Sequence, residues 1–170
     1  VAQPERGLRE ALGEIQRATV WHGGEKLTLE ERPVPTPGAN EVLIKVAACG
    51  ICGTDVHIIE DKFPLYPPPR VIGHEYTGTV AATGARVRKV RPGDRVVVEP
   101  GYTCGDCYFC RQGRENLCEH RIVHPGGFAD YTCVPDRLVH LLPEGVSFEM
   151  GSLAEPLACA LRAWDLAAPP

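Results

Sequence analysis

The sequence predicts a mainly β fold with short helices, and two observations carry this prediction. The 170 residues include 18 glycines and 16 prolines, dispersed along the chain in turn-like pairs and not gathered in one tract. Between these turns lie short runs of β-branched and aliphatic residues. Many short strands joined by tight turns indicate a compact, mainly antiparallel domain that could close into a barrel.

The elements are expected in a simple order. Residues 1–17 are interpreted as a leader or appendage, because Gly7 and Gly13 weaken any helix there. The domain is expected over residues 18–170. Its predicted strands share β-branched and aliphatic composition and are bounded by turns: 19–21, 27–31, 42–48, 76–83, 95–98, 128–134 and 138–141.

Two segments depart from this strand pattern. The stretch from about 101 to 121 has little hydrophobic periodicity, so a metal, and not a core, is expected to hold it together. Near the end, Ser147 can cap a first helical turn and Pro156 stands where a helix can begin. The apolar residues that follow would share one helical face: Leu157, Leu161 and Trp164.

The composition excludes several classes of protein. A net charge of −4 and a pI near 5.9 argue against nucleic acid or an anionic membrane as the main partner, since either favours a basic surface. No apolar run approaches the roughly 20 residues of a membrane span, and no signal peptide precedes the first charges. Eight cysteines in such a chain favour metal binding in a reducing compartment. A cytoplasmic location is therefore expected.

Four cysteines carry the strongest local signal. Cys104, Cys107, Cys110 and Cys118 follow the spacing C-x2-C-x2-C-x7-C. Two-residue gaps let tight turns aim successive thiolates at one point, about 2.3 Å from a tetrahedral zinc. Four sulfur ligands leave no coordination position open, so the pattern predicts a structural zinc. The alternatives are disulfides, which a reducing compartment disfavours, and an iron–sulfur cluster, whose bacterial ferredoxin run has a shorter last gap.

A second set of candidate residues starts with Cys52, in the run Gly50-Ile51-Cys52-Gly53-Thr54-Asp55-Val56-His57. The flanking glycines let the backbone approach a bound ion. Thr54 and His57 are three residues apart and would share a face of one helical turn. A hydroxyl and an imidazole placed in this way can pass a proton from a buried site to solvent. The alternative is that Cys52 packs as a small apolar residue.

Two further positions extend this set. His74 and Glu75 open a predicted strand after Gly73, and both are zinc-ligand types. Neighbouring strand residues point to opposite faces, so both can reach one ion only if the backbone bends at Gly73; otherwise Glu75 supports the site from behind. Glu155 begins the last helix and could cap it, bind the metal, or hold a metal-bound water. Cysteine, histidine and glutamate around one open position describe a catalytic zinc.

These residues resemble a known family. The run Gly73-His74-Glu75-x2-Gly78-x5-Gly84-x2-Val87 resembles the zinc signature of the medium-chain alcohol dehydrogenases. The motif around Cys52, the turn Pro92-Gly93-Asp94 and the run Glu155-Pro156-Leu157 look like the sorbitol and threonine dehydrogenase branch. The resemblance runs from about residue 18 to the last residue.

The resemblance implies a GroES-like β-barrel catalytic domain, with the four-cysteine lobe as its structural zinc site. It implies Cys52 and His74 as catalytic zinc ligands and Glu75 as the third ligand in the polyol branch. Glu155 would face the zinc, directly or through water. Thr54 and His57 match the family's proton relay, and Asp55 matches a residue that supports the zinc ligands from behind. The zinc would lower the pKa of an alcohol, and hydride would pass to a nicotinamide.

The chain departs from the family's pattern in one respect. Full members continue into a Rossmann domain, and no G-x-G-x-x-G occurs in these 170 residues. The chain is therefore expected to be a catalytic-domain fragment, inactive alone, of a parent that uses NAD or NADP and forms a homo-oligomer. Its expected substrate is a small alcohol, polyol or amino alcohol. The competing hypothesis is a stand-alone zinc-binding domain with a structural or interaction role and no catalysis.

Overall fold

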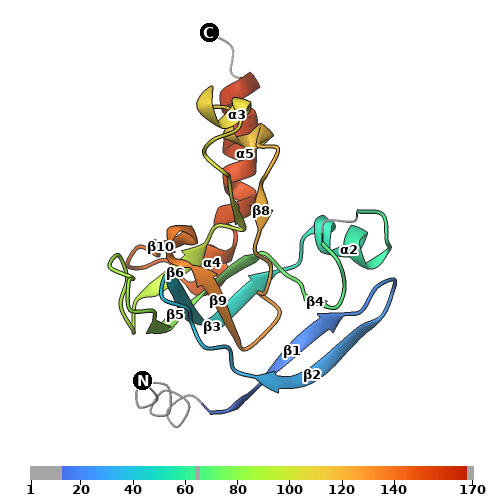
Figure 1. The fold of residues 1–170 in the computed structure, drawn as a ribbon, viewed down its shortest axis with the longest axis vertical. Coiled ribbons are helices and arrows are strands. Elements are labelled where there is room, and N and C mark those ends of the chain that lie inside the picture. Colours follow the sequence, from blue (N-terminus) through green and yellow to red (C-terminus); the bar gives the residue numbers. More distant parts are fainter. Residues whose placement is uncertain (1–12, 64–65, 168–170) are drawn as a thin grey trace.

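A computed structural model describes residues 13–63 and 66–167 and confirms the mainly β fold with short helices (Figure 1). Most of the expected appendage, residues 1–12, lies outside the described part of the chain. The first strand, β1 (Ile15–Trp21), begins before residue 18. Its start is fixed by Gln16, whose side chain donates to the Pro33 carbonyl and accepts a hydrogen bond from the Tyr131 amide.

The strands form three antiparallel sheets. The largest has the order β10-β6-β5-β3-β9, and its strands are β3 (Glu41–Gly50), β5 (Glu75–Thr83), β6 (Arg95–Val98), β9 (Tyr131–Pro135) and β10 (Val139–Leu141). A second sheet has the order β2-β1-β4, with β2 (Leu27–Pro33) and β4 (Arg70–Val71). A two-stranded ribbon joins β7 (Gly101–Tyr102) to β8 (Ile122–Val123).

The strand predictions are confirmed with small shifts in their bounds. The prediction over 95–98 coincides with β6, whereas the one over 128–134 begins too early. Phe128 belongs to a loop, where its amide donates to the Ile72 carbonyl at 3.0 Å. The two-residue strands β4, β7 and β8 are too short to leave a periodic signal.

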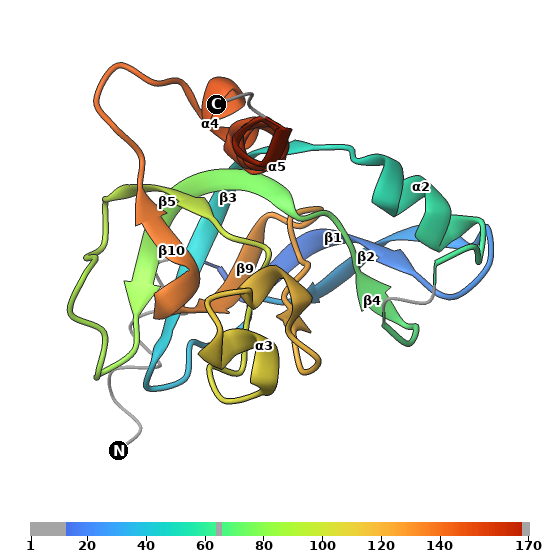
Figure 2. The same cartoon turned by 90° about the horizontal axis from the view of Figure 1, so that it is seen from above.

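Four α-helices complete the described fold: α2 (Gly53–Ile59), α3 (Tyr108–Arg111), α4 (Phe148–Ser152) and α5 (Ala154–Ala167). The predicted cap of α4 is present, since the Ser147 hydroxyl accepts a hydrogen bond from the Met150 amide at 3.2 Å. The predicted apolar face of α5 exists but lies exposed. Figure 1 shows α5 projecting from the β-sheets, and Figure 2 shows it on the opposite side of the molecule from α3.

Two buried clusters hold the parts that carry the site. The first fills the large sheet with fully buried aliphatic side chains, Val42, Ile44, Val96 and Val98 among them. The second comprises Trp21, Ile58, Tyr66 and Ile72, and it pins α2 against β1 and the segment before β5. Each fully buried side chain of this kind contributes about 1.5–3 kcal/mol. The backbone around Cys52 and His74 is therefore held by apolar packing that needs no metal.

Helix length and hydropathy in the described residues rule out a transmembrane helix: none of the helices is both long and apolar enough to span a bilayer.

Candidate metal centres

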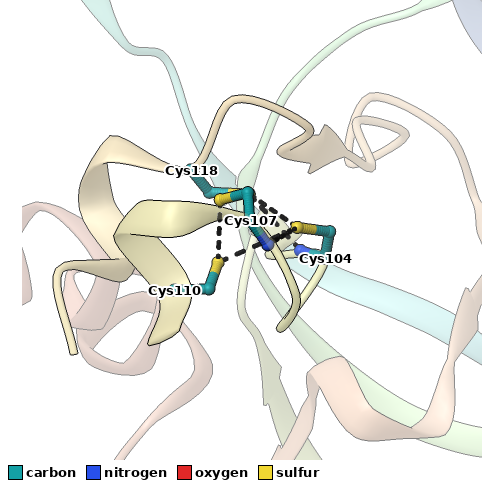
Figure 3. A group of neighbouring side chains, drawn as sticks. All are labelled: Cys104, Cys107, Cys110 and Cys118. Carbon is teal, nitrogen blue, oxygen red and sulfur yellow. Dashed lines mark hydrogen bonds between the residues drawn. The ribbon is translucent and has the colours of Figure 1, made fainter. Parts of the chain in front are cut away.

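The four cysteines of the lobe converge on one point (Figure 3). Their Sγ–Sγ separations are 3.5 Å for Cys107–Cys110, 3.6 Å for Cys104–Cys118 and 3.9 Å for Cys104–Cys110. Four sulfurs placed tetrahedrally about 2.3 Å from a zinc would stand about 3.8 Å apart. A disulfide needs about 2.05 Å, and all eight cysteines are free thiols. The donor set and its spacing thus fit a tetrahedral zinc.

Backbone amides prepare these sulfurs for a cation. The amides of Asp106 and Cys107 donate to Cys104 Sγ at 3.4 and 3.3 Å, and the amides of Cys104 and His120 donate to Cys118 Sγ at 3.4 Å each. Hydrogen bonds from the amides of Cys110 and Glu119 lower the pKa of Cys107 to about 6. Donors of this kind favour the thiolate, which is the form that binds zinc.

The base of the lobe is attached to the rest of the domain by a stack of three side chains. The Arg137 guanidinium lies 3.7 Å from the centre of the Tyr102 ring, which itself stacks on His124 at 5.5 Å. Arg137 also donates to the Thr103 carbonyl at 3.0 Å. The lobe is thus attached through its base, while its interior depends on the four sulfurs.

The second cluster assembles residues from two segments. Antiparallel pairing of β3 with β5 places Gly50 opposite Glu75, so the chain leaves β3 toward Cys52 beside the start of β5. Cys52, His74 and Glu75 each offer one ligand atom, and these atoms lie within 4.8 Å of one another. His74 and Glu75 are largely buried, with 8% and 7% of their surfaces exposed. Sulfur, nitrogen and oxygen donors from three side chains match a catalytic zinc with an open fourth position.

The bend that a shared ion would require before His74 is present. Gly73 has φ +86°, a conformation that costs a non-glycine residue energy, and the regular strand begins only at Glu75. A Cβ at Gly73 would also lie 2.7 Å from the Phe128 ring. Because His74 stands outside the strand, it is released from the alternation that would send it and Glu75 to opposite faces.

Asp55 organises this cluster from behind. Its carboxylate is 1% exposed, and it accepts hydrogen bonds from the amides of Cys52 (3.0 Å) and Gly73 (3.2 Å). It also lies 3.5 Å from Nδ1 of His74. This hydrogen bond is the main reason that the pKa of His74 rises to about 9, while burial opposes the rise. One carboxylate therefore contacts both ligand-bearing segments, and its bond to Nδ1 leaves Nε2 of His74 available to a metal.

Thr54 and His57, the residues of the expected proton relay, both lie on α2. The Cys52 thiol lies 3.6 Å from the Thr54 hydroxyl. His57, one turn further along α2, is 59% exposed and lies 3.7 Å from the Glu60 carboxylate. The two residues thus occupy the inner and outer ends of one helical turn, an arrangement that suits proton transfer.

Glu155 lies outside the group of three ligands. It lines a cavity of about 610 Å³ beside α5, and its Oε1 accepts a 3.7 Å hydrogen bond from the Cys159 thiol. Burial raises the pKa of this thiol, the charges of Glu155 and Cys52 add to the rise, and Arg121 opposes it. Glu155 and Cys159 are four residues apart on a helix, so their side chains lie side by side. This spacing alone could have predicted the contact from the sequence.

Comparison with known proteins gives a consistent picture. Residues 38–144 match the family model described as the alcohol dehydrogenase GroES-like domain. D-arabitol-phosphate dehydrogenase of Enterococcus avium is 39% identical over 146 residues, which cover 83% of this chain and 42% of that protein. Sorbitol dehydrogenase of Bacillus subtilis (strain 168) is 39% identical over 155 residues, covering 86% of this chain and 44% of that protein.

A solved structure agrees with these relatives. An alcohol dehydrogenase (rspB) from Escherichia coli CFT073, complexed with NADH, superposes with a TM-score of 0.85 at 37% identity. The match covers 92% of this chain and 47% of that one. The chain therefore spans less than half the length of these relatives.

Proposed function

The chain belongs to the family of alcohol dehydrogenase GroES-like domains, and from this premise we propose that it forms the zinc-binding catalytic part of an NAD(P)-dependent dehydrogenase acting on small alcohols or polyols. The observation that carries the proposal is the mixed cluster of Cys52, His74 and Glu75, whose ligand atoms lie within 4.8 Å of one another. A purely structural module has no need of a three-ligand site beside a closed four-cysteine one.

The described residues suggest a division of roles. When bound at the mixed cluster, zinc supplies a Lewis acid that lowers the pKa of a hydroxyl group. Thr54 would take up the substrate proton, since its hydroxyl lies beside Cys52, and the exposed His57 would pass it to solvent. Asp55 would keep His74 and the Cys52 loop in place. Glu155, on α5, is the second acidic group available to the site.

The described residues form no Rossmann nucleotide site. Their strand pairings are all antiparallel, and a Rossmann nucleotide site requires parallel strands with a glycine-rich turn. We propose that NAD or NADP binds to another part of the whole protein, and that this chain supplies the metal and the proton path. The free thiols fit a reducing compartment such as the cytoplasm.

The relatives suggest the substrate class. One is named for sorbitol, which is a polyol, and the other for D-arabitol phosphate, which is a phosphorylated polyol. We propose a substrate of this general kind, a compound with several hydroxyl groups of which one is oxidised.

The test is turnover by the complete gene product. We expect reduction of NAD or NADP with at least one member of a panel of polyols and secondary alcohols. Cys52→Ser should abolish this turnover. Cys133→Ser is the matched control, because that thiol lies half-buried in β9 and belongs to neither metal cluster. Turnover that survives Cys52→Ser would contradict the proposal, and two bound zinc ions without any turnover would favour the non-catalytic alternative.

A further inference from the structure

The four sulfurs of the lobe divide into two close pairs (Figure 3). The Sγ–Sγ separation is 3.5 Å for Cys107–Cys110 and 3.6 Å for Cys104–Cys118, and these pairs share no residue. The contact between the pairs, Cys104–Cys110, is longer at 3.9 Å. Four sulfurs allow three ways of forming two disulfides, and the structure favours one of them. Each pair has to close by about 1.5 Å to reach the S–S bond length of about 2.05 Å.

The lobe can follow such a movement without disturbing the rest of the domain. Its helix α3 is a single turn of four residues, in which only Cys110 is buried. The base of the lobe is attached through the stack of Arg137, Tyr102 and His124, which contains no sulfur. None of the four cysteines belongs to a hydrophobic cluster of the described residues. A shift of this size within each sulfur pair therefore leaves those clusters intact.

The two members of each pair differ in their access to solvent. Cys104 is exposed and its neighbour Cys118 is partly exposed, whereas Cys107 is partly exposed and its neighbour Cys110 is buried. An oxidant from solvent thus meets one thiol of each pair first, and the second thiol lies beside it to complete a disulfide. The open centre has only one thiol, Cys52, among its three ligands, so it lacks such a neighbour.

We propose that the lobe is a site of reversible oxidation by hydrogen peroxide, at which its four thiols form the disulfides Cys104–Cys118 and Cys107–Cys110. In each pair, one thiolate attacks peroxide, the O–O bond breaks and the sulfur becomes a sulfenic acid. The neighbouring thiolate then attacks this sulfur, so that the S–S bond forms and the S–O bond breaks. Each pair gives two electrons to one peroxide, which takes up two protons from solvent and leaves as two water molecules.

Oxidation exchanges one way of holding the lobe for another. The Cys104–Cys118 bond joins the two ends of the cysteine segment, and the Cys107–Cys110 bond links the residue before α3 to its third residue. The lobe therefore stays closed, but its sulfurs are no longer thiolates that can bind zinc. A dithiol reductant restores the thiols by disulfide exchange. The inference concerns the lobe alone and does not depend on the proposed catalytic function.

Peptide mapping of the zinc-loaded chain after peroxide treatment tests the inference. Cleavage before Asp106 and after Arg111 divides the lobe into peptides that carry Cys104, the Cys107–Cys110 pair and Cys118. We expect the first and the last of these peptides to be linked to each other, and the middle one to contain an internal disulfide. About two equivalents of peroxide should release one of the two zinc ions. Dithiothreitol with added zinc should restore both the thiols and the bound ion.

Cys159→Ser is the matched control, because Cys159 is the second exposed thiol and belongs to neither metal cluster. This variant should release zinc as the unchanged chain does and should form the same two disulfides. A link between the middle peptide and either of the others would overturn the inference. So would sulfinic acids in place of disulfides, lobe thiols that stay reduced, or zinc release that requires Cys159.

Discussion

The two candidate metal centres of this molecule are built in opposite ways. The closed centre takes its four sulfurs from the fifteen residues between Cys104 and Cys118, a lobe with little apolar core of its own. The open centre takes its ligands from two segments that the β3–β5 pairing brings together. We expect a metal to organise the chain in the first case, and the folded chain to position the metal ligands in the second. Substitutions at the two centres should therefore differ in what they cost.

The largest effect is expected from Cys104→Ala. This change removes one of four sulfurs from a lobe that relies on them, so the lobe should lose its zinc and its order. The free energy of unfolding, measured by urea denaturation, should fall by about 4 kcal/mol or more, the range associated with loss of a metal site. A stability equal to that of the unchanged protein would show that the lobe is held by packing.

Cys52→Ala should cost clearly less stability, although it also removes a zinc ligand. The loop around Cys52 is anchored by Ile58 and Ile72, both buried in the cluster that pins α2. The same urea experiment should show a loss of about 1–2 kcal/mol, near the centre of the range for single substitutions. A loss as large as that of Cys104→Ala would remove the contrast between the two centres.

Asp55→Asn should weaken the open centre without touching the closed one. The substitution replaces the acceptor that holds Nδ1 of His74 and the amides of Cys52 and Gly73. Loss of such a supporting carboxylate costs about 10–100-fold in metal affinity. Competition with a zinc chelator should thus show that one zinc ion is bound more weakly and that the affinity for the other is unchanged. Two unchanged affinities would mean that Asp55 has only a packing role.

Glu155→Gln is expected to have the smallest effect on metal coordination at the open centre. Glu75→Gln is the variant with which it should be compared. Glu75 contributes an oxygen to the three-ligand group, whereas Glu155 lies in the neighbouring cavity. With cobalt replacing zinc, Glu75→Gln should alter the visible absorption of the open centre, and Glu155→Gln should leave it nearly unchanged. The reverse result would make Glu155 the third ligand.

The same contrast explains what the sequence could reveal. The closed centre can be predicted from the sequence because all four of its ligands lie within one short spacing pattern. No contact between distant segments is needed to bring them together. The strands were also predictable, since β-branched runs between turns mark them locally. The open centre was predictable only in part. The sequence indicated that His74 and Glu75 could share one ion only with a bend at Gly73, and it left open whether that bend forms. The choice between Glu75 and Glu155 depends on strand pairing that no local pattern encodes.

Other features depend wholly on the fold. The cavity beside α5 arises where a helix, two strands and the end of the lobe meet, and these four segments are not contiguous in the sequence. The sequence predicted the apolar face of α5 but not its exposure to solvent. Periodicity shows that a helix has an apolar face, but it does not show whether another element covers that face.

Counting zinc ions tests the central claim most directly. Elemental analysis of the purified chain should find close to two zinc ions per molecule. The single variants Cys52→Ser and Cys118→Ser should each reduce that number to one. With cobalt in place of zinc, Cys52→Ser should keep the spectrum of the all-sulfur site, and Cys118→Ser should keep the spectrum of the mixed site. A single zinc ion whose binding does not depend on Cys52 would contradict the existence of the open centre.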